Sequence, residues 1–322
     1  MRKLLKDKPI MNADIFRMYA LSRQPETLPA EIATTGQYNY DQLNACFFYP
    51  SVNTLMEYRI IVVTLMTAGR LVTGQFPTNH FTHIFIDEGG HAVEPECIVP
   101  ITGLMDPRDT SRRAQLVIAG DPKQLGPIVR SAIARNVGLP VSLMERMMTD
   151  IDMYKSQPYD ERYITKLIRN YRSHDSILEI PRRIFYDNQL EACGDSKVLN
   201  CMLDWDKFPV MFHSVFETEE REGDSPSWFN RDEIAQIDMY LTALLIKKSG
   251  TKLKPSDIGI IAPYKKQRFN VAMTRARALL IVIGNPITLE QDSCWKTTTR
   301  LGGKKGKKEQ DHLITERMEA EA

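Results

Sequence analysis

The sequence contains Phe81-Thr82-His83-Ile84-Phe85-Ile86-Asp87-Glu88, an apolar run that ends in two carboxylates. A second apolar run, Gln115-Leu116-Val117-Ile118-Ala119, leads into Gly120-Asp121-Pro122-Lys123-Gln124-Leu125-Gly126-Pro127. Short runs rich in β-branched residues and bounded by turn residues are typical of strands buried within a parallel sheet. Ligands of such sheets bind beyond the carboxyl ends of the strands, and the residues expected at that edge are Asp87, Glu88, Asp121 and Gln124.

Nucleotide hydrolysis is a reaction to which this edge is suited. In phosphoryl transfer, one carboxylate holds magnesium through its water shell, and a neighbouring carboxylate or amide orients the attacking water. Asp87 and Glu88 match these two requirements, although an Asp-Glu pair after an apolar run is by itself more typical of a solvated strand end. The 120–127 turn strengthens the hydrolytic interpretation, because it adds two side chains that can reach a phosphate.

Five ordered motifs resemble those of superfamily 1 RNA helicases. They are Phe85-Ile86-Asp87-Glu88-Gly89-Gly90-His91 with Glu94-Pro95-Glu96-Cys97, the 120–127 turn, Asn170-Tyr171-Arg172-Ser173-His174, Ala262-Pro263-Tyr264-Lys265-Lys266-Gln267, and Arg268-Phe269-Asn270-Val271-Ala272-Met273-Thr274-Arg275-Ala276-Arg277. The set resembles the nonsense-mediated-decay-like group, and most of all its Armitage and Moloney-leukaemia-virus-ten branch, which is associated with small-RNA silencing. The resemblance spans residues 14–296, and five motifs in order are far more specific than any one of them.

The resemblance implies an ATP-dependent RNA helicase with ATP and Mg²⁺ as cofactors. In such an enzyme Asp87 would hold magnesium through water, and Glu88 would activate the attacking water. Asp121 would contact the nucleotide and Tyr171 would stack on adenine. The residues implied to sense the γ-phosphate are Gln124, Arg172 and Arg275, the last of them donated across the cleft between two domains. A planar guanidinium suits the charge that develops on phosphate in the transition state. Considered alone, Tyr171-Arg172 fits a surface turn equally well, and Arg275 fits a solvated helix face better.

Single-stranded RNA is the second implied ligand, and the residues implied to contact it are Thr64, Thr67, Pro263 and Tyr264. Hydroxyl groups suit phosphate oxygens, and backbone contacts suit a translocase that is independent of sequence. A threonine at a strand end also closes a turn, which is the simpler interpretation of Thr64 or Thr67 alone. Silencing proteins are implied as partners, and no obligate oligomer is indicated.

Hydropathy and capping patterns predict the elements between these motifs. Strands are expected at 59–67, 81–86, 115–119, 163–168, 208–216, 257–264 and 278–284, and helices at 13–21, from Glu94, within 128–148, at 233–247 after an Asn230 cap, and at 264–276. By resemblance the fold class is α/β with two RecA-like parallel-sheet motor domains. The expected divisions are 1–58, a connector and partial start of the first domain; 59–190, the partial first domain; 208–296, the shortened second domain; and 297–322, a disordered polar and basic tail.

The chain departs from the family pattern at two places. No Gly-x-x-x-x-Gly-Lys-Ser/Thr phosphate-binding loop occurs in the sequence, so the first domain is expected to lack its N-terminal part. Gln267 runs straight into Arg268, where the family has another motif and a long loop, so the second domain is expected to be shortened. Because the phosphate-binding loop neutralises the β- and γ-phosphates, this chain alone is expected to be inactive. The alternatives are a non-catalytic RNA- or protein-binding module and an incomplete gene model.

Composition bounds the remaining possibilities. The chain has 322 residues, 43% hydrophobic and 26% charged, with a net charge of +1. These values are ordinary for one large or two ordinary globular domains, and they imply that nucleic acid would be bound in a local cleft rather than on a generally basic surface. Five widely spaced cysteines favour reduced thiols over disulfides or zinc. With no secretory leader and no membrane-spanning run expected, we predict a cytosolic or nuclear protein, and within this choice we expect the cytoplasm and its ribonucleoprotein granules.

Overall fold

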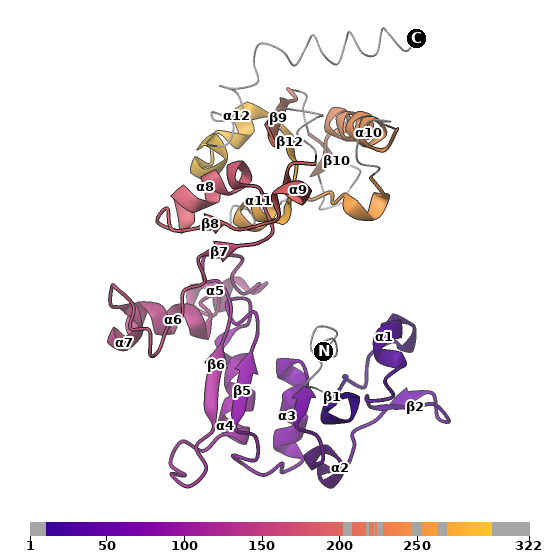
Figure 1. The fold of residues 1–322 in the computed structure, drawn as a ribbon, viewed down its shortest axis with the longest axis vertical. Helices are drawn as coiled ribbons and strands as arrows, with labels where there is room; N and C mark the ends of the chain where they lie inside the picture. Colours follow the sequence, from indigo (N-terminus) through magenta and orange to yellow (C-terminus); the bar gives the residue numbers. More distant parts are fainter. Residues whose placement is uncertain are drawn as a thin grey trace. The chain divides into compact units, whose positions relative to one another are not determined.

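The computed structural model describes residues 11–201, 208–216, 219–221, 223, 228–246, 253–262 and 269–297. It divides into two compact units, and each is described here by itself (Figure 1). Unit 1 comprises Met1–Pro122 and Gly126–Tyr163, and unit 2 comprises Lys123–Leu125 and Ile164–Ala322. Both units mix helices with small parallel sheets, which confirms the α/β class at this level.

Unit 1 contains the acidic motifs of the sequence. Its described strands are β1 (Ile15–Arg17), β2 (Tyr40–Asp41), β3 (Cys46–Phe47), β4 (Ile60–Val62), β5 (His83–Ile86) and β6 (Gln115–Ile118). Its described α-helices are α1 (Ala30–Ala33), α2 (Val52–Met56), α3 (Leu65–Thr73), α4 (Glu94–Leu104), α5 (Ala132–Asn136), α6 (Leu143–Asp150) and α7 (Asp152–Lys155), with short 3₁₀ turns at Asn12–Asp14 and Pro25–Thr27.

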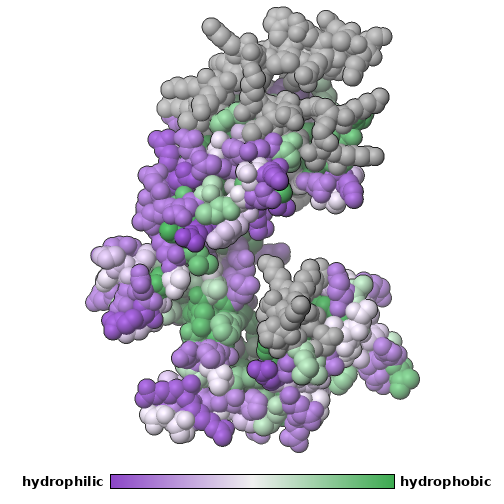
Figure 2. Space-filling view, viewed as in Figure 1, coloured by the Kyte–Doolittle hydropathy of each residue, from purple (hydrophilic) through white to green (hydrophobic). Residues whose placement is uncertain are grey.

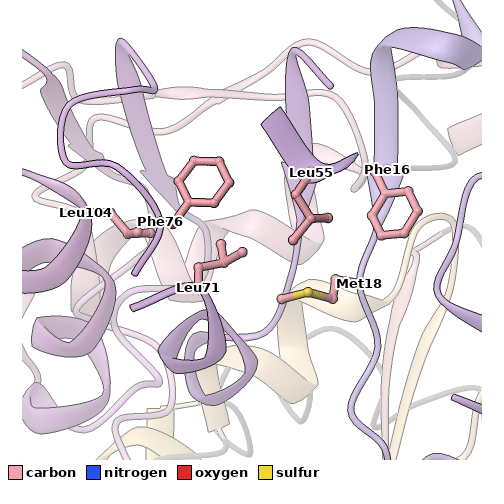
Figure 3. Packing of buried hydrophobic residues seen from close by; sticks show 6 residues of the cluster. All are labelled: Phe16, Met18, Leu55, Leu71, Phe76 and Leu104. Carbon is pink, nitrogen blue, oxygen red and sulfur yellow. The ribbon is translucent and has the colours of Figure 1, made fainter. Parts of the chain in front are cut away.

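Two parallel strand pairs organise unit 1. β1 pairs with β4 and β5 pairs with β6, the latter with Phe85 opposite Val117, and β2 and β3 form an antiparallel pair. The main hydrophobic cluster draws side chains from β1, α2, α3 and α4 and from the chain beside them; its members are Phe16, Met18, Leu55, Leu71, Phe76 and Leu104 (Figure 3). A second cluster of Ile86, Cys97 and Leu143 fixes α4 and α6 against one face of the β5–β6 pair.

In the part of unit 1 that the structure describes, the other face of the β5–β6 pair carries exposed side chains, which corrects the expectation of strands buried on both sides. The Phe85 side chain is 70% exposed and Val117 is 38% exposed, and apolar surface lies over these strands in Figure 2. Parallel sheets are normally covered on both faces. Within the described residues the pair has no third strand, and only the face of Ile84 and Ile86 packs against a hydrophobic cluster.

Unit 2 contains the arginine motifs. Its described strands are β7 (Arg169–Asn170), β8 (Glu191–Ala192), β9 (Val210–Ser214), β10 (Glu220–Arg221), β11 (Trp228–Phe229) and β12 (Leu280–Gly284). Its described α-helices are α8 (Asp175–Phe185), α9 (Ser196–Leu199), α10 (Arg231–Ile246), α11 (Phe269–Arg275) and α12 (Pro286–Leu289), with a 3₁₀ turn at Pro255–Asp257. β9 pairs in parallel with β12, and β7 with β8.

The core of unit 2 forms between α8, α11 and β12. Its buried members are Ile180, Phe269, Met273 and Val282. Phe269 and Met273 lie one turn apart on α11 and are both buried, so the helix predicted at 264–276 is confirmed in its described part. The Asn230 cap of α10 is also confirmed, because its Oδ1 accepts hydrogen bonds from the backbone N–H groups of Asp232 and Glu233.

The strands predicted at 81–86, 115–119, 208–216 and 278–284 form, each one to four residues shorter, as β5, β6, β9 and β12. Four other predicted elements are absent from the described residues or are partly replaced by other structure. The predicted helix at 13–21 is replaced by a 3₁₀ turn and β1, because Ile15 and Phe16 pair with β4. The strand predicted at 59–67 ends at Val62, and Leu65 begins α3. No strand forms at 163–168, where Leu167 is 84% exposed, or in the described part, 257–262, of the strand predicted at 257–264. Apolar runs form strands only where a neighbouring strand pairs with them.

The predicted domain boundaries remain predictions. The two compact units divide at Tyr163 and Ile164, whereas the sequence analysis placed the change of domain between residues 190 and 208. The difference follows from the 163–168 segment: the prediction used it to close the first sheet, but the carbonyl of Ile168 instead accepts a hydrogen bond from Glu191 N within unit 2.

Candidate functional site

The carboxyl ends of β5 and β6 are joined by backbone hydrogen bonds. Ala119 N donates to Ile86 O at 2.8 Å, and Gly89 N donates to Ala119 O at 2.8 Å. The parallel register therefore continues beyond the strands into the turns that follow. This arrangement places Asp87, Glu88 and Asp121 at one edge of unit 1, as expected from the two parallel runs. Gln124 was expected at the same edge, but it belongs to unit 2.

Glycines allow these two turns to touch. A Cβ atom on Gly120 would lie 2.9 Å from Gly90 N and 3.0 Å from Gly89 N, and a Cβ on Gly90 would lie 3.0 Å from Asp121 O. Real Cβ atoms do not approach backbone atoms this closely, so both positions favour glycine for its missing side chain. The Gly-Gly and Gly-Asp-Pro sequences thus allow the backbones of the two turns to lie in contact.

Glu88 has an unusual backbone conformation. Its φ is +56°, in the left-handed region that residues with a Cβ rarely adopt, and its N–H donates to Asp87 Oδ1 at 3.1 Å. The carboxylates of Asp87 and Glu88 are both exposed, and Glu88 Oε2 lies 4.0 Å from His91 Nε2. Left-handed non-glycine residues cluster at functional sites, because the surrounding structure must hold them there.

Helix α4 follows the acidic turn and is held in place by an ion pair and a buried cysteine. Glu94, in its first turn, accepts two hydrogen bonds of 2.6 Å from the guanidinium of Arg146 on α6. The hydrogen bonds from Arg146 lower the pKa of Glu94. Cys97, in the next turn of the helix, is buried, and that burial raises the pKa of its thiol, as expected of a packing residue rather than a reactive one.

In unit 2, a buried serine joins the two arginine motifs. Ser173 Oγ donates to Ala276 O at 2.7 Å, and His174 N donates to Arg277 O at 2.8 Å. Arg172 precedes Ser173 and Arg275 precedes Ala276, so these bonds bring both exposed arginines to one part of unit 2. The predicted bounds had assigned Arg172 to the first domain; the contacts assign it to the same unit as Arg275.

The turn before Arg172 is also preorganised. Asn170 Oδ1 accepts hydrogen bonds from Arg172 N at 2.8 Å and from Ser173 N at 2.9 Å. Tyr171 is 66% exposed, as a residue that stacks on a ligand would need to be. Gln124 belongs to unit 2 as well, within Lys123–Leu125, so the three predicted phosphate sensors share one unit.

The predicted RNA contacts are described only in part. Thr64 is the N-cap of α3; its Oγ1 accepts from Thr67 N at 3.3 Å and donates to Thr67 Oγ1 at 2.8 Å. This capping accounts for both threonines structurally, so their contact with RNA stays a prediction. Pro263 and Tyr264 lie outside the described residues.

A hollow of about 220 Å³ lies elsewhere in unit 1. Met18, Tyr49 and Arg70 are among its lining residues, and none of the predicted site residues lines it. The described residues contain no group of three or more His, Cys, Asp and Glu that could hold a metal ion by themselves. A magnesium ion at Asp87 would therefore take most of its ligands from water and substrate, as magnesium commonly does.

Two polar residues, Ser173 and Asn270, were given no role from the sequence. Both are buried and both hydrogen-bond to backbone atoms of other motifs. A single Ser or Asn gives no periodic signal, so only their place inside recognised motifs could have drawn attention to them.

Two family models match the chain, and both are described as AAA domains. They match residues 31–132 and 139–268, which together make up well over half of the sequence. Among curated proteins, "Putative helicase mov-10-B.1" of Danio rerio is 40% identical over 91% of this chain and 36% of its own length. "RNA helicase Mov10l1" of Homo sapiens is 36% identical over 74% of this chain and 25% of its own length. "Probable RNA helicase armi" of Drosophila melanogaster is 30% identical over 92% of this chain and 32% of its own length.

The chain belongs to the superfamily 1 helicases, in the group that contains the mov-10, Mov10l1 and armi proteins. The sequence motifs had indicated the same branch, so that prediction is confirmed. The AAA matches imply a nucleotide-binding fold. The chain spans about a third of the length of the curated relatives cited here, between 25% and 36%. No helix among the described residues is both long and apolar enough to cross a membrane.

Proposed function

We propose that the chain is part of the motor of an ATP-dependent RNA helicase that acts in RNA silencing. Its two AAA regions would be RecA-like domains, the first without the phosphate-binding loop in these 322 residues and the second internally shortened. The observation that carries the proposal is the double turn at the ends of β5 and β6, which holds Asp87, Glu88 and Asp121 at one sheet edge.

The chemistry of this edge fits magnesium and a nucleotide in part. Asp87 is an exposed carboxylate at a strand end, and such a group suits a hydrated magnesium ion. Bound Mg·ATP would supply the phosphoryl group and neutralise part of its charge. Glu88 would orient the attacking water, Asp121 would contact the nucleotide, and Tyr171 would stack on adenine. Gln124, Arg172 and Arg275 would respond to the γ-phosphate.

The chain alone is proposed neither to bind ATP tightly nor to unwind RNA. Its sequence contains no phosphate-binding loop, whose backbone N–H groups and lysine neutralise the β- and γ-phosphates. Internal shortening is supported by alignment length. The match to the Danio rerio relative extends over 369 residues while covering 91% of a 322-residue chain, so that relative has residues within the match that this chain lacks.

The test is phosphate release from ATP by the purified chain, with and without single-stranded RNA, beside the Glu88→Gln variant. Equal background release by the two proteins is expected. Release by the natural chain that Glu88→Gln abolishes would refute the inactivity of the chain, and would establish Glu88 as the group that activates water. Release that persists in Glu88→Gln would identify a contaminating ATPase.

A non-catalytic binding module is the second candidate, and the missing phosphate-binding loop favours it. Such a chain would bind single-stranded RNA or silencing proteins, in the cytoplasm and its ribonucleoprotein granules, without hydrolysis. Fluorescence anisotropy of a labelled RNA, measured without nucleotide at several salt concentrations, tests it. Binding that weakens steeply with salt indicates phosphate contacts, and no binding at low salt removes the RNA branch of this candidate.

A further inference from the structure

Asn270 connects three separate segments of unit 2. It lies on α11 and is 2% exposed. Its Nδ2 donates to the backbone carbonyl of Lys123 at 3.2 Å and to the hydroxyl of Tyr186 at 2.7 Å. These partners are 147 and 84 residues away in the sequence, and all three belong to unit 2.

The same side chain has an unsatisfied atom. Asn270 Oδ1 is buried and makes no hydrogen bond within the described part of the chain. Burying a polar atom without a partner is unfavourable, and native structures contain few such atoms. Its neighbours Phe269 and Met273 on α11 are apolar and buried. An apolar residue at position 270 would avoid the unfavourable burial, so the amide is better explained by its two donated bonds than by packing.

We infer that Asn270 is a positioning residue that holds Lys123–Leu125, and with it Gln124, on the unit that carries Arg172 and Arg275. The chain leaves unit 1 after Pro122 and returns to it at Gly126, so only three residues of the 120–127 turn belong to unit 2. The bond from Asn270 acts on the first of them. Gln124 is then kept in a fixed place relative to α11, whose last residue is Arg275.

Holding Gln124, Arg172 and Arg275 on one unit would coordinate their response to the γ-phosphate. Arg172 and Arg275 are joined through the Ser173 bond to Ala276, and Gln124 is joined to the same helix through Asn270. The three would therefore act as one set. The role of the set rests on the proposed function, whereas the positioning of Lys123–Leu125 does not.

Limited trypsin digestion of the full chain tests the inference, because trypsin cleaves after Lys123. The bond after Lys155, at the end of α7 in unit 1, serves as the internal reference. In Asn270→Leu, which keeps the branching and the number of heavy side-chain atoms, cleavage after Lys123 relative to Lys155 should rise about fivefold. This ratio corresponds to about 1 kcal/mol, the usual contribution of one hydrogen bond.

Tyr186→Phe is the matched control, because it removes one bond of Asn270 and leaves the bond to Lys123. Its cleavage ratio should remain that of the natural chain. Asn270→Ala gives a second test in case the leucine does not fit, and circular dichroism checks that each variant is folded. An unchanged ratio in both Asn270 variants would overturn the inference, as would an equal rise in Tyr186→Phe, which would indicate general loosening. Because the digestion needs no nucleotide, a failure of the ATPase proposal leaves its result unaffected.

Discussion

At the scale of single residues, the left-handed backbone of Glu88 indicates that glutamate at this position has a role other than stability, because glycine would adopt the same conformation at lower cost. A left-handed conformation costs an L-residue about 1–2 kcal/mol, and glycine avoids that cost while losing about 0.5–1 kcal/mol through its greater freedom when unfolded. We therefore expect Glu88→Gly to raise the free energy of unfolding by about 0.5–1 kcal/mol, measured by urea denaturation.

Glu88→Gln separates the backbone effect from the charge. It keeps the strained conformation and removes the carboxylate, so its stability should equal that of the natural chain. A Glu88→Gly chain that is less stable than both would show that the side chain itself stabilises the turn, and the functional interpretation of the strain would lose its support.

The ion pair of Glu94 with Arg146 predicts a pH-dependent contribution to stability. Glu94→Gln should cost about 1 kcal/mol at neutral pH, because two charge-assisted bonds are lost from a partly exposed pair. Because the folded-state pKa lies below the ordinary value of 4.5, this contribution is complete above about pH 4.5 and disappears as the pH falls through the folded-state value.

Unfolding in urea at neutral pH and at successively lower pH values measures that contribution. Glu96→Gln is the matched control, since Glu96 is a half-buried acid in the same first turn of α4 and experiences the same helix dipole. A difference between Glu94→Gln and the natural chain that stays constant down to acid pH would contradict the ion-pair explanation.

The site residues whose place could be predicted follow recognisable strands, whereas residues held by single long-range hydrogen bonds could not be predicted. Asp87 and Asp121 were placed correctly at one edge, because two parallel runs must end at the same side of a sheet. Ser173 and Asn270 were missed, because their partners lie about a hundred residues away and only the folded chain brings them together. The roles of all these residues remain predictions.

At the scale of elements, the uncovered face of β5 and β6 predicts self-association. Phe85 and Val117 are paired neighbours on this face, and contiguous exposed apolar surface promotes association. Phe85→Lys should reduce the apparent mass seen by light scattering at high protein concentration and leave the fold intact. Leu43→Lys is the control, because Leu43 is 96% exposed but lies on no strand, and it should have no effect. Equal effects of the two substitutions would refute the specific role of the β5–β6 face.

Elements were predicted best where local signals and tertiary pairing agree. α10 begins after its Asn230 cap as expected, and β12 finds a parallel partner in β9. The apolar segment at 258–261 carries the same local signal as β12, but no strand of the described residues pairs with it and Ile260 remains exposed. Strand formation requires a partner that sequence periodicity alone does not reveal.

At the scale of the whole molecule, the two units have separate hydrophobic cores, so we expect them to unfold in separate transitions. Leu71 is buried in a cluster of unit 1, and Phe269 is buried in the cluster of unit 2. Replacing either with alanine should cost about 3 kcal/mol, through lost burial and the cavity that remains. Each substitution should lower the urea midpoint of one transition only.

The positions of the tryptophans make this prediction measurable. All three, Trp205, Trp228 and Trp295, belong by sequence to unit 2, whereas helices and strands occur in both units. Tryptophan fluorescence therefore follows unit 2 alone, and far-ultraviolet circular dichroism follows the whole chain. Phe269→Ala should lower the urea midpoint of the fluorescence transition, because it destabilises unit 2. Leu71→Ala should leave the fluorescence transition unchanged and lower the midpoint of the unit 1 transition, which only circular dichroism reports. A fluorescence transition that moves equally with Leu71→Ala would show that the two units unfold as a single cooperative body.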